Sequence, residues 1–301
     1  MPHSLSLPMP RRRFLALTGG LGFAAWSPPS RADAPSFPAR VATLDYGLAE
    51  TMLAIGVEPV AIASAADWTT WVVEPPLPSA VADLGAAQDP NLERLAALRP
   101  DLVLSTDFTA MAEPALARIA RVERVTLYGT GVDPLPRART VTTLLGDMLG
   151  RAAEARSAIE AYDAEIAGLA GRLAGRSTEP LLLVSFLDPR HVRVYGRSGL
   201  YGNVLDGLGL RNAWDAPVNY WGFSTVGIED LAAAPHARLV AVDPVAPDVW
   251  PTLARSPLWT GLPFVAASRV STVAPALMFG ALPSAGRFAR LLCENLLGER
   301  A

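Results

Sequence analysis

The 301-residue sequence contains no lysine, since all 26 of its basic side chains are arginine. It has one cysteine, Cys293, and three histidines. A Gly-x-x-x-x-Gly-Lys phosphate loop is therefore impossible, and an intramolecular disulfide is excluded even in an oxidising compartment. His191 and His236 do not have the spacing of a His-Glu-x-x-His site. We therefore expect neither an enzyme nor a binder of bare metal ions, and we expect no resident cofactor.

Hydrophobic residues make up 50% of the chain and charged residues 18%, a composition typical of a globular protein and not of a disordered one. The net charge is −3 for the whole chain. An acidic chain of this kind argues against nucleic acid and against anionic membrane surfaces as partners. Because arginine carries the entire basic composition, a single arginine gives little functional information here.

The N-terminus has the features of an export signal. Arg11-Arg12-Arg13-Phe14-Leu15 fits the twin-arginine pattern, and residues 14–26 are apolar but too few to span a bilayer, which takes about 20. Cleavage after Ala32 would remove residues 1–32, with four arginines and no acid, and shift the net charge from −3 to −7. No lipobox cysteine is present. We therefore expect a twin-arginine signal peptide at 1–32 and a soluble periplasmic protein.

Residues 36–136 alternate between short apolar runs and helical patterns. Residues 40–44 and 59–63 indicate strands on either side of a helix at 47–55, and strands are also expected at 102–104 and 125–128. Such alternation is typical of a small lobe built on a parallel sheet.

The longest periodic stretch follows this lobe. Apolar residues keep helical spacing from Val141 to Leu173, with charged residues on the opposite face. We interpret the bridging segment 137–174 as one helix between two lobes, whose periodic stretch of about 34 residues would be roughly 50 Å long. The alternative is two helices broken near Gly150.

A second alternation of strands and helices occupies 178–301. Residues 181–186 indicate a strand whose hairpin or parallel partner is 192–195, and further strands are expected at 239–243 and 268–273, with a last helix at 284–297. The sequence therefore predicts an α/β protein of two lobes with parallel-rich sheets, joined by a backbone helix, with a ligand cleft between the lobes. We expect small movements on binding, because one helix restricts a hinge more than several crossing strands do.

Residues 71–106 carry the most specific pattern. They read Trp71-Val-Val-Glu-Pro-Pro-Leu-Pro, then Asp83-Leu-Gly, then a short helix beginning Pro-Asn-Leu-Glu, then Leu98-Arg-Pro-Asp before a buried strand. This order resembles the periplasmic binding proteins of iron-siderophore and cobalamin ABC importers, and the Trp71–Pro78 run is similar to that of the ferric-hydroxamate (ferrichrome-type) binders. The resemblance implies a monomer that captures a ferric siderophore and delivers it to an inner-membrane ABC permease. The iron would be held by the siderophore and not by the protein.

Aromatic side chains on expected loops are the candidate ligand contacts, since a bulky, partly apolar chelate fits broad rings that carry one polar atom. Asn212-Ala-Trp214 and Asn219-Tyr220-Trp221-Gly222 are similar to the cleft-lining loop of that family. Trp71 and Trp221 are the leading candidates, although every aromatic residue has the alternative of packing inside a lobe. The remaining aromatic candidates are Tyr46, Trp68, Phe108, Trp214, Tyr220 and Phe279.

Two positions depart from the pattern that the resemblance implies. In the hydroxamate binders an arginine and a tyrosine contact the iron-bound oxygens, but Ala87 and Thr109 stand at those positions here. Asp107 or Phe108 could substitute in part. The candidate replacement cations are Arg193, Arg197 and Arg287, of which we favour Arg197, although a surface charge is the alternative for each. The ligand could therefore be a different chelate: a catecholate or carboxylate siderophore, cobalamin or haem.

Glu93 and Glu229 each lie in the first turn of an expected short helix, one in each lobe. A carboxylate there is favoured by the helix dipole alone. The resemblance implies a second role, in which one such glutamate on each lobe docks onto arginines of the permease. An exported hydrolase remains as an alternative from a different functional class.

Overall fold

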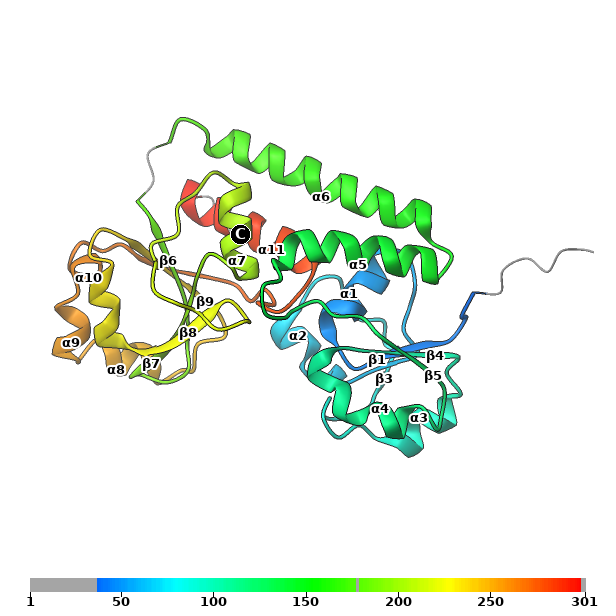
Figure 1. Cartoon of the computed structure of the whole chain (residues 1–301). Helices are drawn as coiled ribbons and strands as arrows, with labels where there is room; N and C mark the ends of the chain where they lie inside the picture. The colour runs from blue at the N-terminus through cyan, green and yellow to red at the C-terminus, as the bar shows by residue number, and fades with distance from the viewer. Residues whose placement is uncertain (1–36, 177–178, 299–301) are drawn as a thin grey trace, which may run out of the picture. The chain divides into compact units, whose positions relative to one another are not determined.

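Two five-stranded sheets, each flanked by helices, organise the described part of the chain, residues 37–176 and 179–298 (Figure 1). The structure is a computed structural model. The expected signal peptide at 1–32 lies outside the described residues. None of the described helices is long and apolar enough to cross a bilayer.

The first sheet has the order β3-β2-β1-β4-β5 and is parallel throughout. Its strands are β1 (Val41–Thr43), β2 (Ala61–Ile62), β3 (Ala82–Asp83), β4 (Leu102–Ser105) and β5 (Arg121–Arg124). The flanking helices are α1 (Tyr46–Ala54), α2 (Trp68–Trp71), α3 (Leu92–Leu98) and α4 (Glu113–Leu116), with 3₁₀ turns η1 (Ala65–Asp67) and η2 (Asp107–Ala112). The expected strand at 125–128 is wrong, because the strand ends at Arg124 and those residues form a loop.

Local sequence accounts for the helix boundaries of this lobe. Asp45 begins α1, where its Oδ1 accepts a hydrogen bond from the Leu48 amide at 3.0 Å. Asn91 begins α3 in the same way, through the Arg94 amide at 2.8 Å. That helix ends at Arg99, which adopts a left-handed conformation (φ 45°) ahead of Pro100.

The second sheet has the order β10-β9-β6-β7-β8. Its strands are β6 (Leu181–Phe186), β7 (His191–Tyr195), β8 (Phe223–Gly227), β9 (Arg238–Val242) and β10 (Val270–Val273). Strands β10, β9 and β6 are parallel, whereas β7 and β8 are antiparallel to their neighbours, so the hairpin alternative for 192–195 is right. The helical segments are α7 (Leu200–Gly207), η3 (Ile228–Ala233), α8 (Val249–Leu253), α9 (Pro257–Thr260), α10 (Pro263–Ala266) and α11 (Leu282–Leu297).

The single helix expected over 137–174 is wrong, and the alternative of a break near Gly150 is right. The chain forms α5 (Pro134–Met148) and α6 (Ala152–Leu173), joined at Gly150 with φ 70°. The two helices pack against each other, with an Arg139–Asp163 ion pair between them. At 22 residues α6 is about 33 Å long. It also packs against α1, α7 and α11, so a helix from this region still links the two lobes.

A continuous hydrophobic cluster joins the lobes. It takes in Leu104 of β4, Val141 of α5, Ile166 of α6, Leu183 of β6 and Phe288 of α11. Each lobe also has a smaller cluster on the other face of its sheet. The expectation of two α/β lobes with parallel-rich sheets is therefore confirmed.

Candidate ligand-binding site

Two adjoining cavities lie between the lobes, with volumes of about 370 and 190 Å³. Both are lined by Asp45, Phe108 and Trp221. The wall formed by the first lobe comes from loops that follow β1, β2, β3, β4 and β5, so the cavities lie at the carboxyl ends of a parallel sheet. This is where open α/β sheets commonly bind ligands.

Trp221 is the centre of the aromatic lining. Its ring centroid lies 4.7 Å from that of Tyr220, 4.9 Å from Phe279, 5.5 Å from Tyr128 and 5.6 Å from Phe108. Phe108 and Tyr128 belong to the first lobe, whereas Trp221, in the loop before β8, and Phe279, in the loop after β10, belong to the second. The predicted contacts Tyr46, Phe108, Tyr220, Trp221 and Phe279 are thus brought together at one site.

A tight turn presents Trp221 to the cavity. Asn219 Oδ1 accepts hydrogen bonds from the amides of Trp221 and Phe223, at 3.0 and 3.3 Å. Gly222 closes the turn with φ 82°, and a Cβ atom built on it would lie 2.1 Å from the Gly199 Cα. Only glycine fits there without a shift of the backbone. The Asn-Tyr-Trp-Gly sequence therefore determines where the indole points.

Tyr46 is fixed on the opposite wall. Its hydroxyl donates to the Ser64 carbonyl at 2.6 Å, and its ring meets Trp68 edge-on at 5.6 Å. Burial raises the pKa of Tyr46 to about 12. The neighbouring carboxyl group of Asp45 lines both cavities, and burial raises its pKa to about 6. Sequence reasoning missed Asp45, because an N-cap aspartate is expected at a helix start whatever the function.

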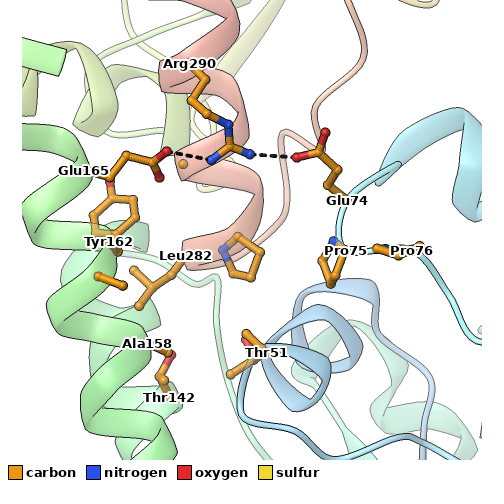
Figure 2. A pocket seen from close by; sticks show the side chains of 14 residues that line it. Thr51, Glu74, Pro75, Pro76, Thr142, Ala158, Tyr162, Glu165, Leu282 and Arg290 are labelled. Atoms are coloured by element: carbon orange, nitrogen blue, oxygen red, sulfur yellow. Dashed lines mark hydrogen bonds and ion pairs between the residues drawn. The ribbon is translucent and has the colours of Figure 1, made fainter. Parts of the chain in front are cut away.

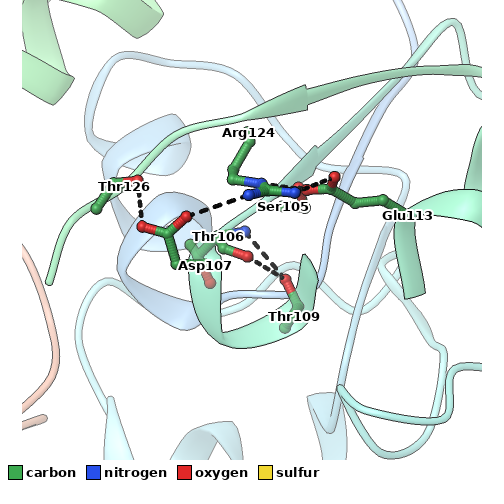
Figure 3. A network of polar contacts seen from close by, with 7 residues as sticks. All are labelled: Ser105, Thr106, Asp107, Thr109, Glu113, Arg124 and Thr126. Carbon is green, nitrogen blue, oxygen red and sulfur yellow. Dashed lines mark hydrogen bonds and ion pairs between the residues drawn. The ribbon is translucent and has the colours of Figure 1, made fainter. Parts of the chain in front are cut away.

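Ala87 lines the larger cavity, but Thr109 does not contribute its hydroxyl. Figure 3 shows that Thr109 Oγ1 turns back to its own loop, accepting from the Thr106 amide at 3.0 Å and donating to the Thr106 carbonyl at 3.3 Å. Thr109 is only 2% exposed. It therefore cannot take the place of a tyrosine hydroxyl at the ligand.

Asp107 is held by the same network (Figure 3). Its carboxylate accepts from Thr126 Oγ1 at 2.6 Å and lies 3.5 Å from Arg124. Arg124 also pairs with Glu113, and this contact holds the pKa of Glu113 below its ordinary value. These bonds anchor the loop that carries Phe108, and they leave Asp107 at the edge of the smaller cavity.

Other predicted contacts lie elsewhere. Trp68 is on α2 and not on a loop, is 1% exposed, and donates its indole N–H to the Pro75 carbonyl at 2.9 Å. Trp214 is 7% exposed in the core of the second lobe. Trp71 is exposed at the end of α2 and is not among the residues lining either cavity. Arg197 pairs with Asp206 at 3.1 Å, with its side chain 79% exposed.

Arg193, which the sequence analysis ranked behind Arg197, lines the larger cavity together with Phe223 and Leu277. The signal in the sequence was a lone arginine within Val192-Arg-Val194. Its neighbours are fully buried while Arg193 is half-buried, so its side chain lies on the face of β7 that borders the cavity. Arg287 instead pairs with Glu74 and donates to the Pro275 carbonyl at 2.7 Å.

A third cavity, of about 640 Å³, lies between α1, α5, α6, α11 and the Glu74–Pro76 loop (Figure 2). Arg290 bridges Glu165 and Glu74 across it, at 2.8 and 2.7 Å. None of the aromatic residues predicted from the sequence lines it. Although it is larger, we place the candidate site at the aromatic cavities, because they combine broad rings with the carboxyl ends of the strands.

Glu93 and Glu229 are exposed in the first turns of α3 and η3, as expected. Within residues 37–176 and 179–298, no cluster of three or more His, Cys, Asp or Glu side chains is placed to hold a metal ion.

Two α/β lobes that meet at an aromatic cleft define a solute-binding protein. The chain belongs to the periplasmic binding protein family, whose model matches residues 41–277. It is 33% identical over 295 residues to the iron(3+)-hydroxamate-binding protein FhuD of Escherichia coli K12, covering 98% of this chain and 99% of that protein.

Solved structures agree with this assignment. The siderophore-binding protein FhuD of Vibrio cholerae, in its Fe³⁺-Desferal complex, matches with a TM-score of 0.81 and 29% identity, over 87% of this chain and 99% of that one. Staphylococcus aureus SirA matches with a TM-score of 0.65 at 22% identity, over 87% of this chain and 100% of that one, which shows a shared fold alone.

Proposed function

We propose that this protein captures a ferric siderophore, with the hydroxamate type favoured, and delivers it to an inner-membrane ABC permease for iron uptake. The observation that carries the proposal is the aromatic cavity around Trp221 between two lobes. Its support is the family membership together with near full-length similarity to an iron(3+)-hydroxamate-binding protein. The protein binds its cargo and does not transform it.

In this proposal Trp221, Phe108, Phe279, Tyr46 and Tyr220 contact the organic part of the chelate. Aromatic faces bury apolar surface at a small entropic penalty, because each ring has only two rotatable bonds. The iron remains coordinated by the siderophore and enters as cargo. Contact with Trp71 requires a part of the ligand that extends beyond the lined cavities. Trp68, Trp214 and Arg197 are left out, because the first two are buried in lobe cores and Arg197 projects into solvent.

A panel of chelates tests the ligand class. Intrinsic tryptophan fluorescence is measured while ferrichrome, ferrioxamine B, ferric enterobactin, ferric citrate, cobalamin and haemin are added in turn. We expect saturable quenching by the hydroxamates at the lowest concentrations, because a ferric chelate beside Trp221 quenches its emission. Saturation only by cobalamin or haemin would contradict the ligand class, and release of a product from any chelate would contradict a binding role.

The proposal extends to the location of the protein and to its contacts with the permease. We place the protein in the periplasm as a monomer, exported through the twin-arginine motif at Arg11–Leu15, with Glu93 and Glu229 docking onto the permease. Exposed charges at a rim steer association more than they fix affinity. Charge reversal at either glutamate should therefore slow siderophore-stimulated ATP hydrolysis by the reconstituted permease while leaving siderophore binding unchanged. Glu160→Arg, on the exposed face of α6, is the matched control.

A further inference from the structure

Among the described residues that line the two aromatic cavities, Arg193 is the only basic one. It lies on β7, opposite Ser185 of β6 and Thr225 of β8, so the backbone of the second sheet fixes its position. The acidic lining residues, Asp45 and Asp107, both belong to the first lobe. The cleft therefore has a positive wall on the second lobe and a negative wall on the first.

The surroundings of Arg193 leave its charge without a counter-ion. Its Nε atom is buried. Within the described part of the chain this atom has no hydrogen-bond partner, and no carboxylate lies within ion-pair distance of the guanidinium. The guanidinium carbon lies 5.1 Å from the centre of the Phe223 ring, and Nη1 is 4.0 Å from the Met278 sulfur. The nearby Tyr195 hydroxyl is hydrogen-bonded to Ser185 at 3.0 Å.

A partly buried cation that lacks an anionic partner is unfavourable unless a ligand supplies one. Phe223 and Met278 hold the guanidinium plane in place, and this lowers the entropic penalty when acceptor oxygens of a ligand bind to it. A guanidinium also presents its donors in a planar fork that matches a pair of adjacent oxygens, which an ammonium group cannot do. A hydroxamate bound to iron offers such a pair of negatively charged oxygens.

We propose that Arg193 is a ligand-binding residue that donates hydrogen bonds to the iron-coordinating oxygens of the chelate, and that the chelate lies with these oxygens facing β7. The inference rests on the proposed function and adds the orientation of the cargo. Ala87, on the opposite wall, offers no donor from its side chain. The cationic hydrogen-bond donor to the iron-coordinating oxygens therefore comes from the second lobe.

Comparing the iron-loaded with the iron-free ligand distinguishes direct recognition by Arg193 from a purely structural role, which would affect both ligands equally. Iron-free desferrioxamine is neutral at its hydroxamic acids at neutral pH, whereas ferrioxamine B carries deprotonated oxygens. Dissociation constants for both forms are measured with the wild-type protein, with Arg193→Met, which keeps the aliphatic length over Phe223, and with Arg197→Met as the matched control at an exposed arginine.

We expect Arg193→Met to lower the affinity for ferrioxamine B about tenfold or more, as for the loss of a charge-assisted hydrogen bond. Its affinity for iron-free desferrioxamine should fall less than about threefold. Arg197→Met should change neither affinity. If Arg193→Met lowered the affinity for both forms equally, or lowered neither, the inference would be overturned. If the wild-type protein binds no ferric siderophore at all, the proposed function itself fails.

A second variant, Arg193→Lys, covers the case in which Arg193→Met does not fold. We expect Arg193→Lys to bind ferrioxamine B with intermediate affinity, because the charge remains but the planar fork is lost. Full wild-type affinity for ferrioxamine B in Arg193→Lys would contradict recognition by the planar guanidinium.

Discussion

Trp221 contacts more aromatic rings than any other described residue of the site. It is half-buried and touches Phe108 and Tyr128 of the first lobe as well as Phe279 and Tyr220 of the second. Its position depends on the Asn219 side chain and on the glycine that follows it. A ligand that enters the cleft therefore meets a fixed indole face.

Trp221→Ala should weaken ferric hydroxamate binding by at least about tenfold, because buried aromatic anchors at interfaces are worth roughly 2 kcal/mol or more, and it should remove most of the fluorescence quenching. Trp250→Phe is the control, since Trp250 packs against Phe186 in the second lobe away from the cleft. Equal affinity in Trp221→Ala and Trp250→Phe would argue against the site.

At the residue scale the sequence predicted which aromatic residues line the site better than it predicted where the arginine side chains point. Tyr46, Phe108, Tyr220, Trp221 and Phe279 were named from the pattern, and the structure places them around the two adjoining cavities. Arg193 and Arg197 lie four residues apart, and only the strand register of β7 shows that the first borders the cavity while the second pairs with Asp206 in solvent. Register of this kind is set by tertiary pairing and not by the local sequence.

The burial of Glu50 leads us to expect that the stability of the protein depends on pH. It is fully buried on α1, where it accepts hydrogen bonds from the Ala281 amide and from the amide and hydroxyl of Ser284 at the start of α11. Burial outweighs these bonds and raises its pKa from 4.5 to about 7. The native state then binds a proton more tightly than the unfolded state does. The free energy of unfolding should therefore fall as pH rises from about 4.5 to about 7, by on the order of 3 kcal/mol from this group.

Urea unfolding of the wild-type protein and of Glu50→Gln at pH 5 and pH 8 checks this. The glutamine stays neutral, so its stability should decline less over this interval than that of the wild type. Asp45, whose pKa is also raised by burial, contributes in the same direction in both proteins. Parallel declines in the two proteins would show that Glu50 does not titrate in this range.

At the element scale the break between α5 and α6 was the main error in the sequence interpretation. Apolar spacing continues across it, because both helices bury a face in the same cluster. The backbone signal was Gly150 alone, and an isolated glycine within a helical pattern does not distinguish a break from a continuous helix. The strand β8 (Phe223–Gly227) was also missed, since it directly follows the loop that carries Trp221 and lacks a fully buried run.

Gly150→Ala should destabilise the protein by about 1–2 kcal/mol, since alanine is disfavoured at φ 70°. A Cβ atom there would also come within 2.5 Å of the Phe37 ring. Gly168→Ala is the matched control within α6, where a Cβ would meet nothing within 4 Å. It should stabilise by roughly 0.5–1 kcal/mol through helix propensity. Thermal unfolding that shifts in the same direction for both variants would refute this account of the break.

At the scale of the whole molecule, one core serves both lobes. The cluster runs from Leu104 through α5 and α6 to Leu183 and Phe288. Tyr128 and Glu50 of the first lobe also bond to Gly280 and Ser284 at the start of α11. From these shared contacts we expect only small relative movements of the lobes.

The shared core predicts a single unfolding transition. Urea unfolding followed by tryptophan fluorescence and by far-ultraviolet circular dichroism should give coincident curves, because neither lobe can lose its core alone. Separate midpoints for the two signals would show that the lobes unfold independently. Bound ferric siderophore should then raise the midpoint of the whole transition by mass action.

The most direct measurement is the location of the iron. A crystal of the protein grown with ferrioxamine B, with diffraction collected at the iron absorption edge, gives an anomalous peak at the metal. We predict one strong peak in the cavity lined by Tyr46, Phe108 and Trp221, on the side that Arg193 faces. A peak in the cavity between α1, α6 and α11, or saturating ligand with no peak between the lobes, would contradict the account.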